Sequence, residues 1–303
     1  MLKVEKQSFS YGKKPLLKNL SFKVNKGENL AIIGESGSGK TTLLKLIYGE
    51  HDLDEGVIFW KDEQILGPKF NLVVGYDFMK YVSQEFDLMP FISVEENIGK
   101  FLSNFFPEEK NKRVRELLDV VELSDFKDTK VKNLSGGQKQ RVALARALAK
   151  QPEIILLDEP FSHIDNFKKQ PLRRKVFNYL KRNNITCLVA THDKNDVLGF
   201  ADNILFLNNG TIEIMGAPED LYHNPKTPLI ASFFYEFNII DGKIVYANQL
   251  KVVDDSSLRV EVVKCYFNGN GYLIEALLNN KSILFESKKE FSKATQVCLA
   301  INP

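Results

Sequence analysis

The chain has 303 residues, 44% hydrophobic and 26% charged, a composition typical of a folded protein with room for one large and one small domain. Its 41 basic and 39 acidic residues give a formal charge of +2, which argues against a nucleic-acid surface built on bulk positive charge. No apolar run reaches the roughly 20 residues of a membrane span, and three distant cysteines, Cys187, Cys265 and Cys298, indicate neither a disulfide framework nor a zinc site.

The first part of the chain carries both strand and helix signals. Residues 16–33 predict two strands separated by a turn at Gly27, and the second strand runs into a glycine-rich loop. Apolar residues at helical spacing over 42–48 predict a helix, and residues 56–60 and 80–83 predict strands. We therefore expect a mixed α/β domain.

A helical pattern interrupts this domain. Residues 88–150 predict a helical insertion, which ends with a helix over 139–150. Continuous apolar runs of strand length follow at 154–157, 186–190 and 203–207, the pattern of strands buried in a parallel sheet.

The composition changes near residue 236, and the tail reads as short strands with turns. Strands are predicted over 239–247, 258–267, 272–278 and 297–301, with a hairpin turn at Asn268-Gly269-Asn270-Gly271. We expect two domains, 1–236 and 237–303, of which the second is small and all-β. A core of that size gives only marginal stability, so we expect the tail to be stabilised by contacts with the first domain or with a second chain.

A phosphate-binding pattern, GxxxxGK[ST], follows the buried strand and precedes a helix. Glycines let backbone N–H groups wrap an anion at the helix N-terminus, Lys40 can reach the β and γ phosphates, and Thr41 can bind Mg²⁺. The alternative is a flexible turn without a ligand. The residues of the loop are Gly34, Glu35, Ser36, Gly37, Ser38, Gly39, Lys40 and Thr41.

Two carboxylates, Asp158 and Glu159, end the apolar run over 154–157, where α/β sheets place their ligands. Asp158 suits a metal shell and Glu159 suits the activation of water; a plain helix cap before Pro160 is the alternative. Residues Ser135, Gly136, Gly137 and Gln138 open the helix that precedes this strand, so they offer a second anion site or an ordinary serine cap.

Three segments together resemble the nucleotide-binding subunits of ATP-binding cassette (ABC) transporters: the glycine loop, LSGGQKQRVALARAL and IILLDEP. The likeness covers about residues 2–235. It implies that residues 34–42, including Thr42, form the Walker A loop, that Asp158 is the Walker B aspartate and that Glu159 is the catalytic base. Ser135, Gly136, Gly137 and Gln138 match the signature that contacts ATP.

The same resemblance assigns three further residues. Tyr11 matches the aromatic that stacks on adenine, and Gln84 matches the residue that touches Mg²⁺ and the attacking water and begins the loop facing the membrane subunits. His192 matches the switch histidine on the γ-phosphate. Judged alone, these would be a surface aromatic, a surface glutamine and a structural histidine.

The loop Ser162-His163-Ile164-Asp165 matches the family's dimer-contact loop, with Asp165 as its aspartate, except that the family usually has a small residue in place of His163. The resemblance implies that two copies of the chain enclose two ATP molecules with Mg²⁺, each phosphate loop facing the other copy's signature. ATP binding then closes the pair, and hydrolysis reopens it.

The expected function is the ATPase of an ABC transporter that works with separate membrane-spanning permease subunits, and for import with a solute-binding protein. Residues 210–222 and the tail more weakly resemble importer cassettes with an OB-like (TOBE-type) domain, which serve polyamine, iron, sulfate, molybdate or sugar uptake; the usual Arg-Pro-Glu element is missing. We expect a cytoplasmic protein, peripheral on the inner face of the membrane, with no nucleic-acid partner.

Three alternatives remain open from the sequence. The same ATPase could drive export or lipid movement, or a soluble ABC ATPase could act on nucleic acid or ribosomes. The third is a nucleotide-binding regulator without turnover, which the presence of Glu159 and His192 argues against.

Overall fold

The computed structural model describes residues 1–302 and divides into two compact units, Met1–Pro218 and Glu219–Pro303. The boundary differs from the composition change at residue 236 because two short helices, α7 (Pro218–His223) and α8 (Pro228–Phe234), pack with the tail. The ring of Tyr222 stacks on Tyr246 at 4.7 Å, and its hydroxyl accepts a hydrogen bond from Asn248. The division into functional domains 1–236 and 237–303 stays a prediction.

A six-stranded sheet forms the centre of the first unit, in the order β10-β9-β3-β8-β7-β6. Its five strands from β9 to β6 are parallel, and β10 pairs antiparallel with β9. All residues of β3, β7 and β8 are buried, as their continuous apolar runs predict. The strands are β3 (Asn29–Ile33), β6 (Met79–Val82), β7 (Ile154–Asp158), β8 (Thr186–Ala190), β9 (Asn203–Asn208) and β10 (Thr211–Gly216).

A four-stranded antiparallel sheet stands beside it, in the order β2-β1-β4-β5. The two strands predicted over 16–33 are β2 and β3, and they belong to different sheets. Helix α1 (Lys40–Tyr48) packs its buried leucines and isoleucine into the core that both sheets share. The strands are β1 (Leu2–Tyr11), β2 (Lys14–Val24), β4 (Glu55–Trp60) and β5 (Glu63–Gln64).

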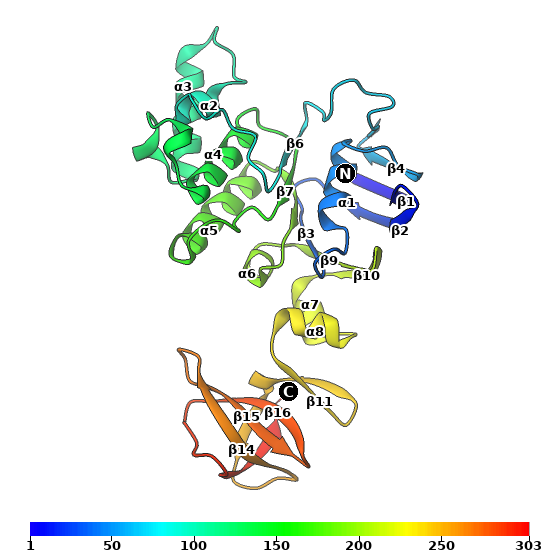
Figure 1. The fold of residues 1–303 in the computed structure, drawn as a ribbon, viewed down its shortest axis with the longest axis vertical. Helices are drawn as coiled ribbons and strands as arrows, with labels where there is room; N and C mark the ends of the chain where they lie inside the picture. Colours follow the sequence, from blue (N-terminus) through cyan, green and yellow to red (C-terminus); the bar gives the residue numbers. More distant parts are fainter. Residues whose placement is uncertain (303) are drawn as a thin grey trace. The chain divides into compact units, whose positions relative to one another are not determined.

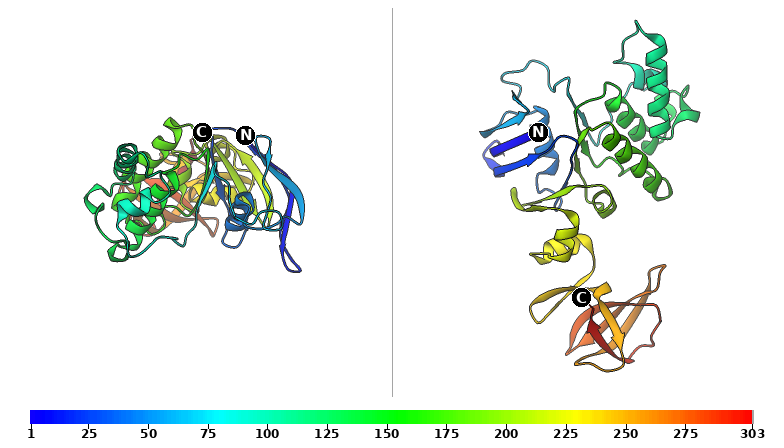
Figure 2. Two further views of the ribbon diagram at one scale, coloured as in Figure 1. Left: turned by 90° about the horizontal axis from the view of Figure 1, so that it is seen from above. Right: turned by 180° about the vertical axis from the view of Figure 1, so that it is seen from behind.

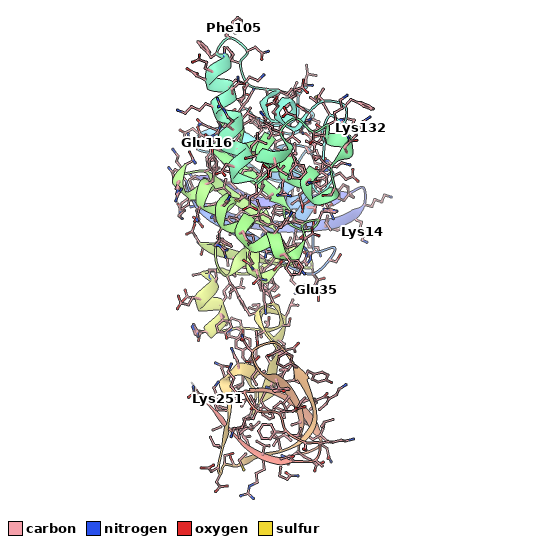
Figure 3. The ribbon with its side chains drawn as sticks, turned by 90° about the vertical axis from the view of Figure 1, so that its left-hand side faces the viewer. Lys14, Glu35, Phe105, Glu116, Lys132 and Lys251 are labelled. Atoms are coloured by element: carbon pink, nitrogen blue, oxygen red, sulfur yellow. The ribbon has the colours of Figure 1, made fainter. Side chains whose placement is uncertain are left out.

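The predicted helical insertion contains α2 (Val94–Gly99), α3 (Pro107–Val120) and α4 (Gly136–Leu148), with short 3₁₀ turns at Ser124–Phe126 and Val131–Asn133. Together with α5 (Asn166–Arg182), these helices lie on one side of the parallel sheet, and the antiparallel sheet lies on the other (Figures 1 and 2). The turn between α2 and α3 carries Phe105 at the tip of the group (Figure 3). A short helix, α6 (Lys194–Val197), follows β8.

The second unit is an antiparallel five-stranded sheet, in the order β13-β17-β14-β15-β16, with a separate hairpin β11-β12. The predicted Asn268–Gly271 turn is confirmed, since Phe267 pairs with Tyr272 across it. The single strand predicted over 239–247 is wrong: Asp241 and Gly242, at φ 48° and 75°, turn the chain back. The strands are β11 (Phe237–Ile240), β12 (Lys243–Tyr246), β13 (Leu250–Val253), β14 (Leu258–Phe267), β15 (Tyr272–Leu278), β16 (Lys281–Ser287) and β17 (Gln296–Ile301).

The tail therefore has its own small core, which contains buried residues from every strand from β11 to β17, Phe285 and Leu299 among them. This confirms the all-β, OB-like character that the sequence predicts. Within residues 1–302, no helix combines the length and the apolar character that crossing a bilayer requires.

Candidate nucleotide site

The glycine loop joins β3 to α1 and depends on residues without a side chain. Gly34, Gly37 and Gly39 have φ values of 154°, 81° and 105°, which disfavour any other residue. A Cβ atom on Gly34 would lie 2.1 Å from the carbonyl oxygen of Leu207, and one on Gly39 would lie 2.6 Å from the side chain of Leu17. Only glycine fits at these positions, and the resulting loop can turn its backbone N–H groups toward a bound phosphate.

Two side chains of this loop fit an anion. The Nζ atom of Lys40 donates to the carbonyl oxygens of Gly34 and Glu35 at 2.8 and 3.0 Å, so the ammonium lies across the loop. Burial lowers the pKa of Lys40, while the charges of Glu159 and Asp158 oppose that shift. The buried Oγ atom of Ser38 has no hydrogen-bond partner among residues 1–302, and a phosphate oxygen would supply one. Thr42 is buried behind the loop.

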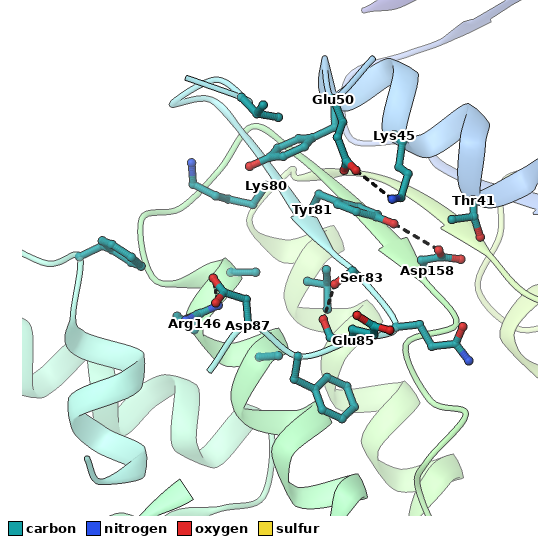
Figure 4. A pocket seen from close by; sticks show the side chains of 18 of the residues that line it. Thr41, Lys45, Glu50, Lys80, Tyr81, Ser83, Glu85, Asp87, Arg146 and Asp158 are labelled. Carbon is teal, nitrogen blue, oxygen red and sulfur yellow. Dashed lines mark hydrogen bonds and ion pairs between the residues drawn. The ribbon is translucent and has the colours of Figure 1, made fainter. Parts of the chain in front are cut away.

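The carboxylate of Asp158 ends β7 and is almost fully buried. It accepts a 3.2 Å hydrogen bond from the hydroxyl of Tyr81 (Figure 4). The side chain of Thr41 lies beside the same carboxylate (Figure 4). Burial raises the pKa of Asp158, and its hydrogen bonds and nearby lysines work in the opposite direction.

Thr41, Gln84 and Asp158 line one cavity of about 780 Å³, so the structure brings together the three predicted metal residues. Hydroxyl, amide and carboxylate oxygens suit Mg²⁺, which commonly takes its remaining ligands from phosphates and water. No cluster of three or more His, Cys, Asp or Glu side chains that could hold a metal occurs in residues 1–302. The donor set therefore fits a magnesium ion shared with a nucleotide.

Glu159 lies at a strained turn. Its φ of 50° is in the left-handed region, which strains the backbone of a non-glycine residue. Its backbone carbonyl accepts hydrogen bonds from Gln140 at 2.8 Å and Ser162 at 3.0 Å, and its Oε1 atom lies 2.7 Å from Nδ1 of His192. The structure thus brings the predicted base and the predicted switch histidine together.

The segment that carries His192 is held by a buried arginine. Arg173, on α5, is 2% exposed and donates to the carboxylates of both Asp193 and Asp196. The hydroxyl of Thr191 donates to Asp196 at 2.6 Å. Residues on both sides of His192 are therefore anchored, while the histidine side chain is three-quarters exposed.

The predicted signature starts α4, where Ser135 and Gln138 form a reciprocal capping box. The Ser135 hydroxyl accepts from the Gln138 backbone at 3.3 Å, and the Gln138 side chain accepts from the Ser135 backbone at 2.9 Å. A Cβ atom on Gly137 would lie 2.7 Å from the carbonyl oxygen of His163, while Gly136 has room at 4.0 Å from the His163 Cβ. Residues 135–138 are not among those that line the cavity bounded by Thr41 and Asp158.

Comparison with known proteins decides the family. Residues 17–162 match the family model described as ABC transporter. The spermidine/putrescine import ATP-binding protein PotA of Bacillus cereus is 33% identical over 293 residues, which cover 95% of this chain and 88% of the relative. The chain belongs to the ABC transporter ATP-binding subunits. It is an ATPase that uses ATP with Mg²⁺.

Other relatives support the same assignment for this ABC subunit. PotA of Clostridium acetobutylicum is 33% identical over 273 residues, which cover 89% of this chain and 75% of the relative. The dimeric, post-hydrolysis structure of the ATP-binding cassette MJ0796 with ADP and Pi has a TM-score of 0.63 and 31% identity, covering 72% of this chain and 98% of that one. The structure of cbiO1 from Clostridium perfringens, part of the transporter complex cbiONQ, has a TM-score of 0.65 and 27% identity, covering 77% and 98%.

Tyr11 of this ABC subunit ends β1 with about half of its side chain exposed. Its ring meets Phe9 edge-on at 4.9 Å and His51 at 5.7 Å, and its hydroxyl lies 3.4 Å from Nε2 of His51. The exposed part of the ring is free to stack on a base, although the same geometry suits a surface aromatic.

Three residues that position the site of the ABC subunit are not predicted from the sequence: Tyr81, Gln140 and Arg173. Tyr81 and Gln140 are polar residues within a predicted strand and a predicted helix, which is the one signal the sequence offers for them, whereas the helix of Arg173 is itself not predicted. Their partners lie 77, 19 and 20 residues away along the chain, so only the fold reveals what they hold.

Proposed function

We propose that this subunit drives the import of polyamines, small organic polycations, from the inner face of the cell membrane. Similarity to the Bacillus cereus polyamine-import protein carries the proposal, because it extends over 95% of the chain and so includes the β-rich tail. Its partners are separate membrane-spanning permease subunits and a solute-binding protein that delivers the polyamine.

The phosphate-binding roles follow from the geometry of the loop. Lys40, the loop N–H groups and the unpartnered Ser38 hydroxyl bind the β and γ phosphates. Thr41, Gln84 and Asp158 hold Mg²⁺, which neutralises phosphate charge when it is bound. Tyr11 stacks on the adenine.

The hydrolytic roles belong to Glu159 and His192. Glu159 orients the attacking water and accepts its proton as a general base. Its position supports this role, because Glu159 directly follows Asp158 at the end of β7 and its carboxylate contacts His192. His192 donates a hydrogen bond from its ring to the γ-phosphate oxygen. Lys40 and the loop N–H groups stabilise the negative charge that spreads over the transferred phosphoryl group.

A second copy of the chain completes the site. Ser135, Gly136, Gly137 and Gln138 form the N-terminus of α4, which favours an anion, and the similar cassette MJ0796 is dimeric in its structure with ADP and Pi. We assign them to the ATP bound by the partner copy. The γ-phosphate then bridges two subunits, so binding closes the pair and hydrolysis removes the bridge.

Transport in reconstituted vesicles tests this proposal. The subunit, its membrane partners and the solute-binding protein are placed in liposomes, and ATP-dependent accumulation of radiolabelled spermidine is measured beside sulfate and ferric iron. Accumulation of spermidine alone, abolished by Glu159→Gln, is expected. Accumulation of another solute refutes the polyamine assignment, ATP-driven efflux refutes import, and purification of the subunit with ribosomal RNA in place of membrane proteins favours the soluble alternative.

A further inference from the structure

His163 makes a contact that links two loops of the catalytic site. Its ring meets the ring of Phe86 edge-on, with centroids 5.5 Å apart and planes at 77°. Phe86 lies two residues after Gln84, and both line the cavity that Asp158 bounds. A small residue at position 163, as the family usually has, could not reach Phe86.

The backbone of His163 is tied to Glu159 through a buried amide. The N–H of His163 donates to Oε1 of Gln140 at 3.1 Å, and Nε2 of the same Gln140 donates to the carbonyl of Glu159 at 2.8 Å. Gln140 is 1% exposed, so water does not compete for these bonds. The backbone at residues 163 and 159 should therefore shift together.

A second, shorter link runs through Ser162. Its hydroxyl donates to the carbonyl of Glu159 at 3.0 Å and lies 3.1 Å from Nδ1 of His163. The imidazole of His163 is thus linked to Glu159 through the Ser162 hydroxyl, and its ring contacts Phe86 in the segment after Gln84.

We propose that His163 is a positioning residue that couples the Gln84 segment to the Glu159 turn through its contact with Phe86. The inference rests on the catalytic roles proposed for Gln84 and Glu159. When the Gln84 segment moves, the Phe86 ring carries His163 with it, and Gln140 passes the displacement to Glu159. The base is then aligned only when the Gln84 segment is in place.

A double-mutant cycle in the full-length protein tests this coupling. His163→Ala, Phe86→Ala and the double variant are compared for kcat and KM of ATP hydrolysis and for the midpoint of thermal unfolding. Each single change should lower kcat about 3- to 10-fold, the range of one aromatic pair, with KM within about twofold of wild type. The double variant should be no slower than the slower single variant.

A matched variant separates the ring contact from mere filling of space. His163→Phe keeps the edge-on contact and should retain more than half of the wild-type kcat, whereas His163→Leu should behave like His163→Ala. Multiplicative effects in the double variant would overturn the proposal, because His163 would then act elsewhere, for example on a second copy of the chain. A wild-type kcat in His163→Ala, or a loss confined to thermal stability, would also overturn it.

Failure of this inference is distinguishable from failure of the roles on which it rests. If Glu159 is the base and only the coupling is wrong, Glu159→Gln is inactive while the cycle is multiplicative. If Glu159→Gln keeps its turnover, the assignment of the base itself is wrong.

Discussion

The Oε1 atom of Glu159 lies 2.7 Å from Nδ1 of His192. The two residues follow the ends of neighbouring parallel strands, in which Asp158 of β7 pairs with Ala190 of β8. Strand pairing therefore sets the distance between a carboxylate and an imidazole that are 33 residues apart in the sequence. The contact orients Glu159 and requires a proton on Nδ1, because a carboxylate only accepts hydrogen bonds. The other ring nitrogen can donate to a phosphate oxygen when both ring nitrogens carry protons.

Replacing this histidine should impair chemistry more than binding. His192→Ala removes both the γ-phosphate contact and the partner of Glu159, so kcat should fall roughly 100-fold, with less than threefold change in affinity for an ATP analogue. Steady-state phosphate release and fluorescent-nucleotide binding measure the two quantities. His223→Ala, in the tail unit, is the control and should hydrolyse ATP like wild type; equal losses in both variants would contradict the role.

The lysine of the glycine loop should be indispensable. Lys40→Ala removes the ammonium that lies across the loop, and turnover should fall below about 1% of wild type because transition-state charge loses its main stabilising cation. Lys281→Ala, at an exposed position of β16 in the second unit, is the control and should hydrolyse ATP like wild type. Unchanged phosphate release in Lys40→Ala would refute this role.

The hydroxyl of Tyr81 should lower the Mg²⁺ concentration that the ATPase activity requires. Tyr81→Phe deletes the donor to Asp158 while keeping the ring, so the carboxylate loses one orienting hydrogen bond. We expect the Mg²⁺ concentration that gives half-maximal ATPase activity to rise about 10-fold, with less effect on the rate at saturating Mg²⁺. Titration of Mn²⁺ binding by electron paramagnetic resonance gives a readout independent of turnover. An unchanged midpoint for both ions would contradict the prediction.

The anchor of the His192 segment should respond to pH. Burial raises the pKa of Asp196 to about 6, above the roughly 3.9 of an unfolded aspartate. The folded state thus holds the proton more tightly, so the contribution of Asp196 to the free energy of unfolding is greatest below the unfolded pKa and is lost as pH rises through about 6. Asp196→Asn cannot ionise and lacks this loss.

Thermal unfolding measures the difference between the two proteins. The unfolding midpoint of Asp196→Asn relative to wild type should rise between about pH 4 and about pH 6.5 and be level above that. A relative midpoint that falls over this range would show that the ion pair with Arg173 dominates over burial.

The sequence predicts those parts of the site that depend on local spacing. The glycine loop, the strand ending in Asp158 and Glu159, and the cap at Ser135 each lie within a few residues, and the fold leaves each as predicted. Because β7 and β8 pair as parallel neighbours, the residues that follow their ends, Glu159 and His192, then lie close together.

Contacts between distant segments are not readable from the sequence in this way. Arg173 lies in α5, which is not predicted from the sequence because Pro171 within it obscures the helical pattern. In the tail, β13 and β16 are absent from the predicted strands. The prediction of one strand over 239–247 also overlooks Asp241-Gly242, a dipeptide that is itself a hairpin signal. The link from His163 to Phe86 likewise depends on two loops meeting in space.

The account depends above all on ATP being held by two chains, each supplying Ser135 to the other's nucleotide. The most direct measurement is the solution mass of Glu159→Gln with and without ATP and Mg²⁺, by size-exclusion chromatography with light scattering. The account predicts a monomer that doubles in mass only with ATP and Mg²⁺, and a Ser135→Arg second change that abolishes the doubling while leaving ATP binding intact. A Glu159→Gln protein that binds ATP and stays monomeric, or that dimerises equally well with Ser135→Arg, would contradict it.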